Sequence, residues 1–281
     1  MLDLKRSQEM DEHIVGICGG PDEGVLFIAD SINGAVRSLN VHTAELSSGD
    51  LYRCRDGEEI CDVAYCTEWN TLFIAIKHLE QLVLLSFVRT NGVLIECHRL
   101  STKVRVTSSI IIRFLPNGTL FCSQILSDTV IVYNVDEERY MERIGSLTFP
   151  KMHWGFDVQF VGEETRLVAA LYDKSVALFR MEEDKCALKL TQLRSIPLLR
   201  KPQFPLFCND ALLVQKEAED GNSHKVVVIP MTDGSWRSQR YRVLHTFDGQ
   251  FCSKAWCYIH GTLVAHIPQN QELQLFTVEY S

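Results

Sequence analysis

The sequence lacks any apolar run approaching the about 18 residues that a membrane-spanning helix requires. Met1 to Asp11 is mostly polar and gives no sign of a secretory signal peptide. We therefore expect a protein without a membrane segment, located in the cytoplasm or nucleus. No linker rich in proline and serine divides the 281 residues, and this favours a single domain over residues 1–281.

The local signatures of common catalytic sites are also absent. Gly16, Gly19 and Gly20 are not followed by the helical pattern that a phosphate-binding loop needs. No stretch resembles a nucleophile elbow, although serine, histidine and aspartate are all present. These absences disfavour an enzyme, and we expect no cofactor.

Ten cysteines are present, but no CxxC pair occurs among them. Cys61 and Cys66 are five residues apart, and on a strand such residues point to opposite faces. This spacing disfavours a zinc site. Most of the cysteines lie in predicted strands, where a free thiol acts as a small apolar side chain, so we expect them to be reduced.

What the sequence does have is a repeated strand–turn–strand unit, first seen as VLFIADSINGAVRSLNV from Val25 to Val41. Asn33 and Gly34 predict the turn, because both residues accept positive φ readily. The unit recurs along the chain, and its leading leucines are 46, 48, 47, 46 and 50 residues apart, at Leu26, Leu72, Leu120, Leu167, Leu213 and Leu263. Such a period is typical of one four-stranded propeller blade. We predict an all-β, six-bladed β-propeller with four antiparallel strands in each blade.

The repeat also predicts an inner strand before each unit. The inner strands are expected to begin near residues 13, 60, 109, 155, 204 and 255. The sixth unit ends at Ser281 and has no room for its outer strand. We expect Met1 to Arg6 to supply that strand and close the ring, which would remove an exposed sheet edge and favour a monomer.

The first unit, from Val25 to Arg37, resembles the core of an NHL repeat. The likeness rests on the run Val25 to Ala29, followed by Asp30, Ser31 and Asn33, and on Val36 and Arg37. The other units keep the apolar positions and lose the aspartate and asparagine. The resemblance implies a ring-shaped binding platform. Members of this broad class include protein-binding domains, RNA-binding domains and some metal-dependent enzymes.

Asp62 and Asp157 occupy the same place in their repeats, ten residues before the leading leucine. Inner strands line the channel of a propeller, so these carboxylates are the alternative candidates for a metal site and for a metal-dependent hydrolase. Two carboxylates are few for calcium, which takes six to eight oxygen ligands. We therefore expect each aspartate to accept hydrogen bonds from backbone N–H groups of a neighbouring strand or turn.

The topology sorts charges between two rims. The first rim carries the turns that join strands one to two and three to four, and it is rich in acidic residues. The second rim carries the two-to-three turns and the connections between blades. Its candidate binding residues are Lys103, Arg105, Lys151, His153, Trp154, Arg200 and Lys201. Clustered like charges steer partners, so we expect a non-catalytic scaffold or adaptor that binds an acidic segment of a protein partner here.

Binding of RNA is the alternative function for this rim. The formal net charge of −8 disfavours it, because phosphate neutralisation supplies most nucleic-acid affinity. The basic residues are also not interleaved with aromatic side chains, apart from Trp154 beside His153 and Lys151.

Overall fold

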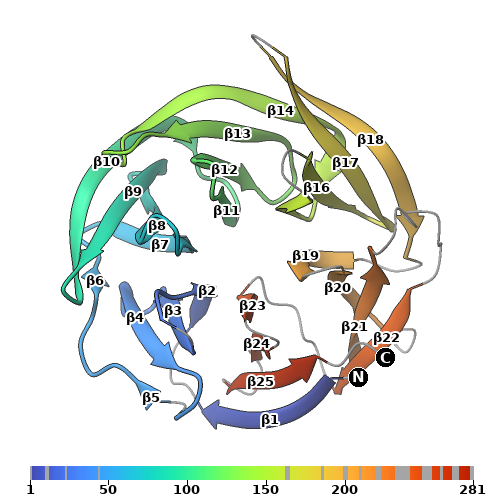
Figure 1. The fold of residues 1–281 in the computed structure, drawn as a ribbon, viewed down its shortest axis with the longest axis horizontal. Helices are drawn as coiled ribbons and strands as arrows, with labels where there is room; N and C mark the ends of the chain where they lie inside the picture. The colour runs from blue at the N-terminus through green and yellow to red at the C-terminus, as the bar shows by residue number, and fades with distance from the viewer. Residues whose placement is uncertain are drawn as a thin grey trace.

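The computed structural model describes residues 2–9, 13–22, 24–43, 45–161, 165–184, 187–198, 202–208, 211–218, 223–231, 241–248, 255–259, 262–267 and 272–278. These residues form six antiparallel sheets arranged as a β-propeller, which confirms the predicted fold class (Figure 1). No helix occurs in this part of the chain, and none is therefore present there that could cross a membrane.

Each blade is numbered here from the inner strand outward. Blade 1 is formed by β2 (Ile14–Gly19), β3 (Val25–Asp30), β4 (Ala35–Asn40), β5 (Glu45–Leu46) and β6 (Tyr52–Arg53), and blade 2 by β7 (Glu58–Cys66), β8 (Thr71–His78), β9 (Gln81–Thr90) and β10 (Val93–Arg105). Blade 3 is formed by β11 (Ile110–Leu115), β12 (Thr119–Gln124), β13 (Ser127–Val135) and β14 (Met141–His153), and blade 4 by β15 (Gly155–Val161), β16 (Thr165–Tyr172), β17 (Ser175–Asp184) and β18 (Ala187–Pro197). Blade 5 is formed by β19 (Pro202–Cys208), β20 (Ala211–Glu217), β21 (Ser223–Pro230) and β22 (Arg242–Asp248), and blade 6 by β23 (Trp256–Ile259), β24 (Thr262–Ile267), β25 (Glu272–Val278) and β1 (Leu2–Glu9).

The second strand of each blade is apolar on both of its faces because it is packed between two neighbouring blades. In β8, Leu72 packs in the core between blades 1 and 2, whereas the next residue, Phe73, packs in the core between blades 2 and 3. Successive strand residues point to opposite faces, so an unbroken apolar run serves two cores at once. The six leading leucines are all fully buried: Leu26, Leu72, Leu120, Leu167, Leu213 and Leu263.

One hydrophobic cluster fills each of the six interfaces between blades. The cluster that joins blade 6 to blade 1 contains Val264 and Leu275 on one side and Ile17 and Leu26 on the other. The ring is therefore closed by packing as well as by strand pairing. Burial of this kind contributes about 25 cal/mol for each Å² of apolar surface removed from water.

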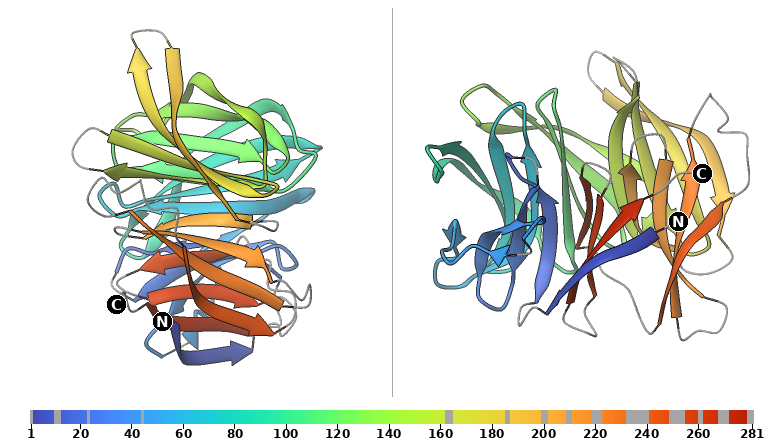
Figure 2. Two further views of the ribbon diagram at one scale, coloured as in Figure 1. Left: turned by 90° about the vertical axis from the view of Figure 1, so that its right-hand side faces the viewer. Right: turned by 60° about the horizontal axis from the view of Figure 1, so that its bottom comes forward.

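The N-terminal strand β1 pairs antiparallel with β25, from Leu2 opposite Val278 to Glu9 opposite Glu272. This confirms that the start of the chain completes the last blade, although the strand continues to Glu9 instead of ending at Arg6. Figures 1 and 2 show β1 along the outside of this blade, beside β25.

Blade 1 departs from the regular pattern at its outer edge. Its outer strand is divided into β5 and β6, which pair with opposite ends of β4. Between them the chain leaves the sheet, and Asp50 there accepts a hydrogen bond from Arg37 Nε at 2.9 Å. Side-chain contacts thus replace part of the strand ladder in this blade.

Candidate functional site

The channel at the centre of the ring contains the two predicted carboxylates. Ile112 donates its backbone N–H to Asp62 Oδ2 at 2.9 Å, and Phe207 donates its backbone N–H to Asp157 Oδ2 at 2.7 Å. Each aspartate therefore binds the inner strand of the next blade. This confirms that the two side chains accept backbone hydrogen bonds from a neighbouring strand.

Arg113, on the inner strand between them, was not expected from the sequence. Its Nε lies 2.8 Å from Asp157 Oδ1, and its Nη1 lies 3.5 Å from Asp62 Oδ2. The guanidinium thus supplies the positive charge that a metal ion would supply between the carboxylates. Asp62 and Asp157 are buried and form an ion cluster with the partly buried Arg113. This arrangement favours a structural role for the two carboxylates over the alternative role as metal ligands.

The protonation of this cluster follows from burial and charge. Burial alone would lower the pKa of Arg113, but the carboxylates of Asp157 and Asp62 outweigh it and the net shift is upward. Burial raises the pKa of Asp157, and Arg113 with the N–H of Phe207 offsets part of that rise. We treat the cluster as an Arg⁺ shared by two carboxylates, because each carboxylate also accepts a backbone hydrogen bond.

The cysteines do not gather into a site within the described part of the chain. Eight of them lie there, and all are free thiols. Burial raises the pKa of Cys66 to about 11 and that of Cys54 to about 11, so both stay protonated at neutral pH. Among the described residues, no group of three or more histidine, cysteine, aspartate or glutamate side chains is arranged to hold a metal ion.

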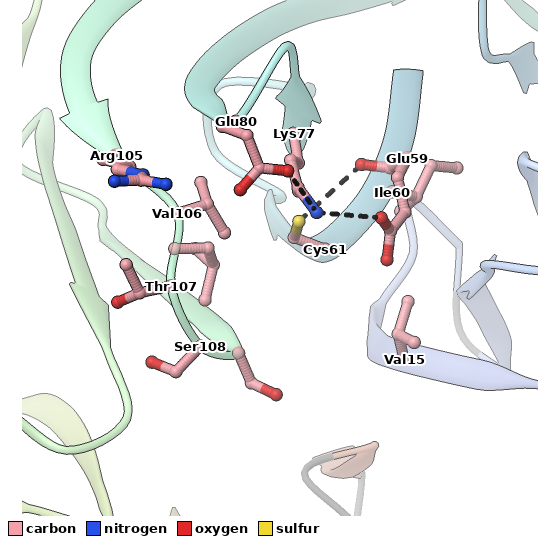
Figure 3. A pocket seen from close by; sticks show the side chains of 12 residues that line it. Val15, Glu59, Ile60, Cys61, Lys77, Glu80, Arg105, Val106, Thr107 and Ser108 are labelled. Carbon is pink, nitrogen blue, oxygen red and sulfur yellow. Dashed lines mark hydrogen bonds and ion pairs between the residues drawn. The ribbon is translucent and has the colours of Figure 1, made fainter. Parts of the chain in front are cut away.

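A pocket of about 450 Å³ opens on the second rim between blades 2 and 3 (Figure 3). On one side, Lys77 Nζ lies 3.1 Å from Glu80 Oε1 and 3.7 Å from Glu59 Oε2. The hydrogen bond with Glu80 raises the pKa of Lys77. Arg105 lies on the other side, next to the connection that leads into blade 3. The remaining lining residues are Val15, Ile60, Cys61, Val106, Thr107, Ser108, Ser109 and Ile110.

The connection after Arg105 is held in place by hydrogen bonds from both blades. Val106 donates its backbone N–H to the Glu80 carbonyl of blade 2 at 2.8 Å. From blade 3, Gln124 Oε1 accepts the N–H of Thr107 at 2.8 Å, and Gln124 Nε2 donates to the Arg105 carbonyl at 2.8 Å. The backbone at Arg105 is therefore fixed, while its side chain is exposed and forms no ion pair with any described residue.

The predicted site residues do not share one pocket. Lys103 is exposed but lines a separate hollow of about 290 Å³ with Tyr133 and Arg143, between the outer parts of blades 2 and 3. Lys151 is exposed near the end of β14, and Trp154 is half-buried against the core between blades 4 and 5. Arg200 and Lys201 lie outside the described residues.

His153 differs from the expectation that it belongs to a docking surface. Its side chain is fully buried, and its ring meets Phe149 and Phe156 edge-on at centroid distances of 5.2 and 5.6 Å. Ser123 Oγ lies 3.0 Å from His153 Nε2. Burial lowers the pKa of His153 to about 4, so the ring is neutral at pH 7. This histidine is part of the core and is unavailable to a partner.

Exposed apolar residues at the two-to-three turns are a second feature that the sequence reasoning missed. Ile32, Leu79 and Leu126 are 73%, 80% and 48% exposed at the tips of blades 1, 2 and 3. Leu79 has φ 48° and Leu126 has φ 62°. The left-handed region costs a residue with a Cβ about 1–2 kcal/mol. The available signal was the run HLEQ at His78 to Gln81, where the repeat requires a turn but supplies neither glycine nor asparagine.

No protein-family model matches the chain, and no curated protein matches it in sequence. Among solved structures, a chain of the mitotic checkpoint complex aligns with a TM-score of 0.65 and 8% identity, over 99% of this chain and 92% of that chain. The β-propeller domain of Cps50 (Swd1) from Myceliophteria thermophila aligns with a TM-score of 0.61 and 10% identity, over 99% and 100%. A chain of Kuenenia stuttgartiensis hydrazine synthase aligns with a TM-score of 0.59 and 10% identity, over 98% of each. Identities this low establish the propeller fold alone.

Proposed function

We propose that the chain is a non-catalytic protein-interaction platform, a scaffold or adaptor, that binds a partner on its second rim. Arg105 carries the proposal, because its backbone is fixed by Gln124 while its side chain is exposed beside a pocket and unpaired within the described chain. A positioned guanidinium suits a carboxylate supplied from outside, since its planar fork binds both carboxylate oxygens. The partner accordingly docks through an acidic segment.

The proposed docking surface extends from Arg105 to Lys103 and Lys151, which are exposed. Arg200 and Lys201 lie outside the described residues and are assigned to it only from their place in the sequence between β18 and β19. Unpaired cations at a rim increase the rate at which an acidic partner associates. Trp154, three residues after Lys151 in the sequence, adds a half-buried aromatic side chain that packs against the core between blades 4 and 5. His153 is left out of this surface because it is buried.

The similar solved structures are consistent with a protein partner, because one is a chain of a checkpoint complex. The hydrazine synthase structure shows that a similar fold also occurs in an enzyme, so the fold alone does not decide between the two functions. The non-catalytic character therefore rests on the site, where both channel carboxylates are already engaged by Arg113 and by backbone N–H groups.

We assign the chain to the NHL-like class of six-bladed propellers on the geometry of its first turn. Asp30 Oδ1 accepts the N–H of Ile32 at 2.9 Å and that of Asn33 at 3.3 Å, and the Asn33 amide also donates to Asp30. Gly34 takes the positive φ, 58°, that the turn requires. The aspartate and asparagine of the repeat motif thus act together to hold the turn.

A reducing compartment, the cytoplasm or nucleus, suits a chain whose eight described cysteines are free thiols. A monomer is supported by the pairing of β1 with β25, which covers the edge that β25 would otherwise expose.

The test is a charge reversal on the second rim. Lys103, Arg105, Arg200 and Lys201 are changed to Glu, and partners are recovered by affinity purification and identified by mass spectrometry. With the purified partner, the variant should associate about tenfold more slowly at low salt. Its Tm should stay near that of the parent protein, because Lys103 and Arg105 are exposed and substitutions at exposed positions usually change stability little.

The matched control reverses Glu137, Glu138, Glu182 and Glu183 to Lys on the first rim. Loss of the partner in this control, with normal binding by the second-rim variant, would show that the wrong face is proposed. Recovery of single-stranded RNA in place of a protein, lost on reversal of the same cations, would favour the RNA-binding alternative.

A further inference from the structure

The apolar tips of blades 1 to 3 lie on the same rim as Arg105. All three tips join the second strand of a blade to the third, and such turns lie on the second rim. The tip of blade 4 is different, since it presents the exposed polar residues Asp173 and Lys174. Among the four tips that the structure describes, those of blades 1 to 4, the apolar character is therefore confined to blades 1 to 3.

The leucines at the tips of blades 2 and 3 are not residues that would be chosen for stability alone. Leu79 is 80% exposed, and both it and Glu80 have positive φ, 48° and 64°. Asparagine and glycine adopt this two-residue turn with less strain than leucine and glutamate. Leu126, in the corresponding turn of blade 3, also has a positive φ, 62°. Backbone strain of this kind is often found at functional sites.

Arg105 and the two leucine tips form one rigid unit. The N–H of Val106 binds the carbonyl of Glu80, the residue after Leu79, at 2.8 Å. On the other side, Ser108 Oγ donates to the carbonyl of Ile125, the residue before Leu126, at 2.6 Å. The connection that carries Arg105 is thus bonded to the tip of blade 2 and to the tip of blade 3.

The Leu126 tip is also held by a backbone hydrogen bond to the end of β14. Its backbone N–H donates to the carbonyl of the buried His153 at 2.8 Å. Its side chain remains 48% exposed even so. An exposed apolar side chain on a fixed backbone loses little entropy when it binds, which favours its use as an anchor.

We propose that this unit, Leu79, Arg105 and Leu126, binds an extended segment of a partner protein in which an acidic residue lies between large apolar residues. The inference rests on the proposed function and specifies the chemistry of the partner. The carboxylate pairs with Arg105 at the pocket, and the flanking apolar side chains cover Leu79 and Leu126. Charge then governs how fast the segment associates, and apolar contact governs how slowly it dissociates.

The experiment uses a phage-displayed library of random dodecamer peptides, selected on the full chain. The enriched sequences should contain Asp or Glu flanked by Leu, Ile, Met, Phe or Trp. The strongest peptide is then synthesised, and its Kd is measured for variants by fluorescence anisotropy. Leu79→Asn and Leu126→Asn should each weaken binding about tenfold and leave the salt dependence of Kd intact.

The same substitutions should not lower the Tm, because asparagine accepts positive φ more readily than leucine. Arg105→Glu should weaken binding and remove most of the salt dependence. The matched control is Val93→Asn, since Val93 is 63% exposed but begins β10 at the first rim. This control should bind the peptide as the parent protein does.

Each other outcome is decisive. If Arg105→Glu loses the peptide but both leucine variants bind normally, the second rim is the docking face and the apolar anchors are wrong. If neither kind of variant affects binding, the peptide docks elsewhere and the proposed function fails with the inference. If no peptide is enriched, a linear apolar–acidic segment is excluded as the partner, while the charge-reversal test of the platform still stands.

Discussion

Two arginines of the first rim, Arg89 and Arg139, make contacts within the molecule. Arg89 of blade 2 pairs with Asp22 of blade 1 at 3.1 Å. Arg139 of blade 3 donates to Thr71 Oγ1 at 2.7 Å and to the Trp69 carbonyl at 3.0 Å in blade 2, and its guanidinium lies 5.0 Å from the centre of the Trp69 ring. Each of these arginines therefore connects two blades.

The cations at the ends of the outer strands on the second rim differ. Lys103, Arg105 and Lys151 are exposed, and none of them forms an ion pair with the residues that the structure describes. The two rims thus contain the same kinds of side chain in different roles. Whether a neighbouring blade offers a partner decides if a rim cation stabilises the ring or remains available for binding.

The largest expected effect comes from opening the ring, on which both rims depend. Deletion of residues 1–9 removes β1 and leaves the edge of β25 unpaired. We expect the Tm to fall by about 10 °C or more, since 1 kcal/mol corresponds to about 2–4 °C in a chain of this size. The freed edge should also promote oligomers, measured by size-exclusion chromatography with light scattering. A deletion variant that stays monomeric and equally stable would contradict the proposed role of β1.

A smaller effect is expected from pH, and it tests whether His153 belongs to the core beneath the second rim. Its pKa is lowered to about 4 in the folded state, against about 6.5 when unfolded, so the unfolded chain binds more protons between these values. The contribution of His153 to stability is therefore present above pH 6.5 and is lost as the pH falls towards 4. Between pH 7 and pH 5 this loss is about 2 kcal/mol.

His153→Gln should flatten this part of the pH dependence, measured by denaturant unfolding at several pH values. His266 also has a lowered pKa, about 4. Its contribution to the pH dependence of the free energy of unfolding should remain in the variant. An unchanged slope in His153→Gln would mean that the ring is accessible to water and could belong to the docking surface after all.

The smallest effect contrasts one arginine from each rim. Arg139→Gln removes three hydrogen bonds, to Thr71, Glu137 and Trp69, together with the contact with the Trp69 ring. It should lower the free energy of unfolding by about 1–2 kcal/mol. Arg105→Gln should change it by less than about 0.5 kcal/mol. Binding to the second-rim partner should be weakened more by Arg105→Gln than by Arg139→Gln. Equal losses of stability in the two variants would remove the distinction between the rims.

Much of the architecture could be predicted from the sequence. The repeat predicted the six buried leucines, the antiparallel blades and the closure by the start of the chain. Backbone hydrogen bonds to Asp62 and Asp157 were expected because aspartate often accepts them, and both are present. These features follow from the alternation of side chains along a strand and from the constant length of a blade, which are local properties.

The roles of individual polar and apolar side chains were decided by the tertiary structure. Arg113 meets Asp62 and Asp157 because three inner strands converge on the channel, although the arginine is about fifty residues from one carboxylate and forty-four from the other. Neither carboxylate could be assigned to it from spacing alone.

At the second rim, too, the tertiary structure decides which side chains are exposed, even for residues close together in the sequence. Lys151 is exposed while His153, two residues later on the same strand, is enclosed by Phe149 and Phe156. Sequence determined that this chain forms a ring of blades, since strand periodicity and apolar pattern suffice for that. Which charges are neutralised and which remain free was decided only by the packing of one blade against the next, because each partner comes from a different repeat.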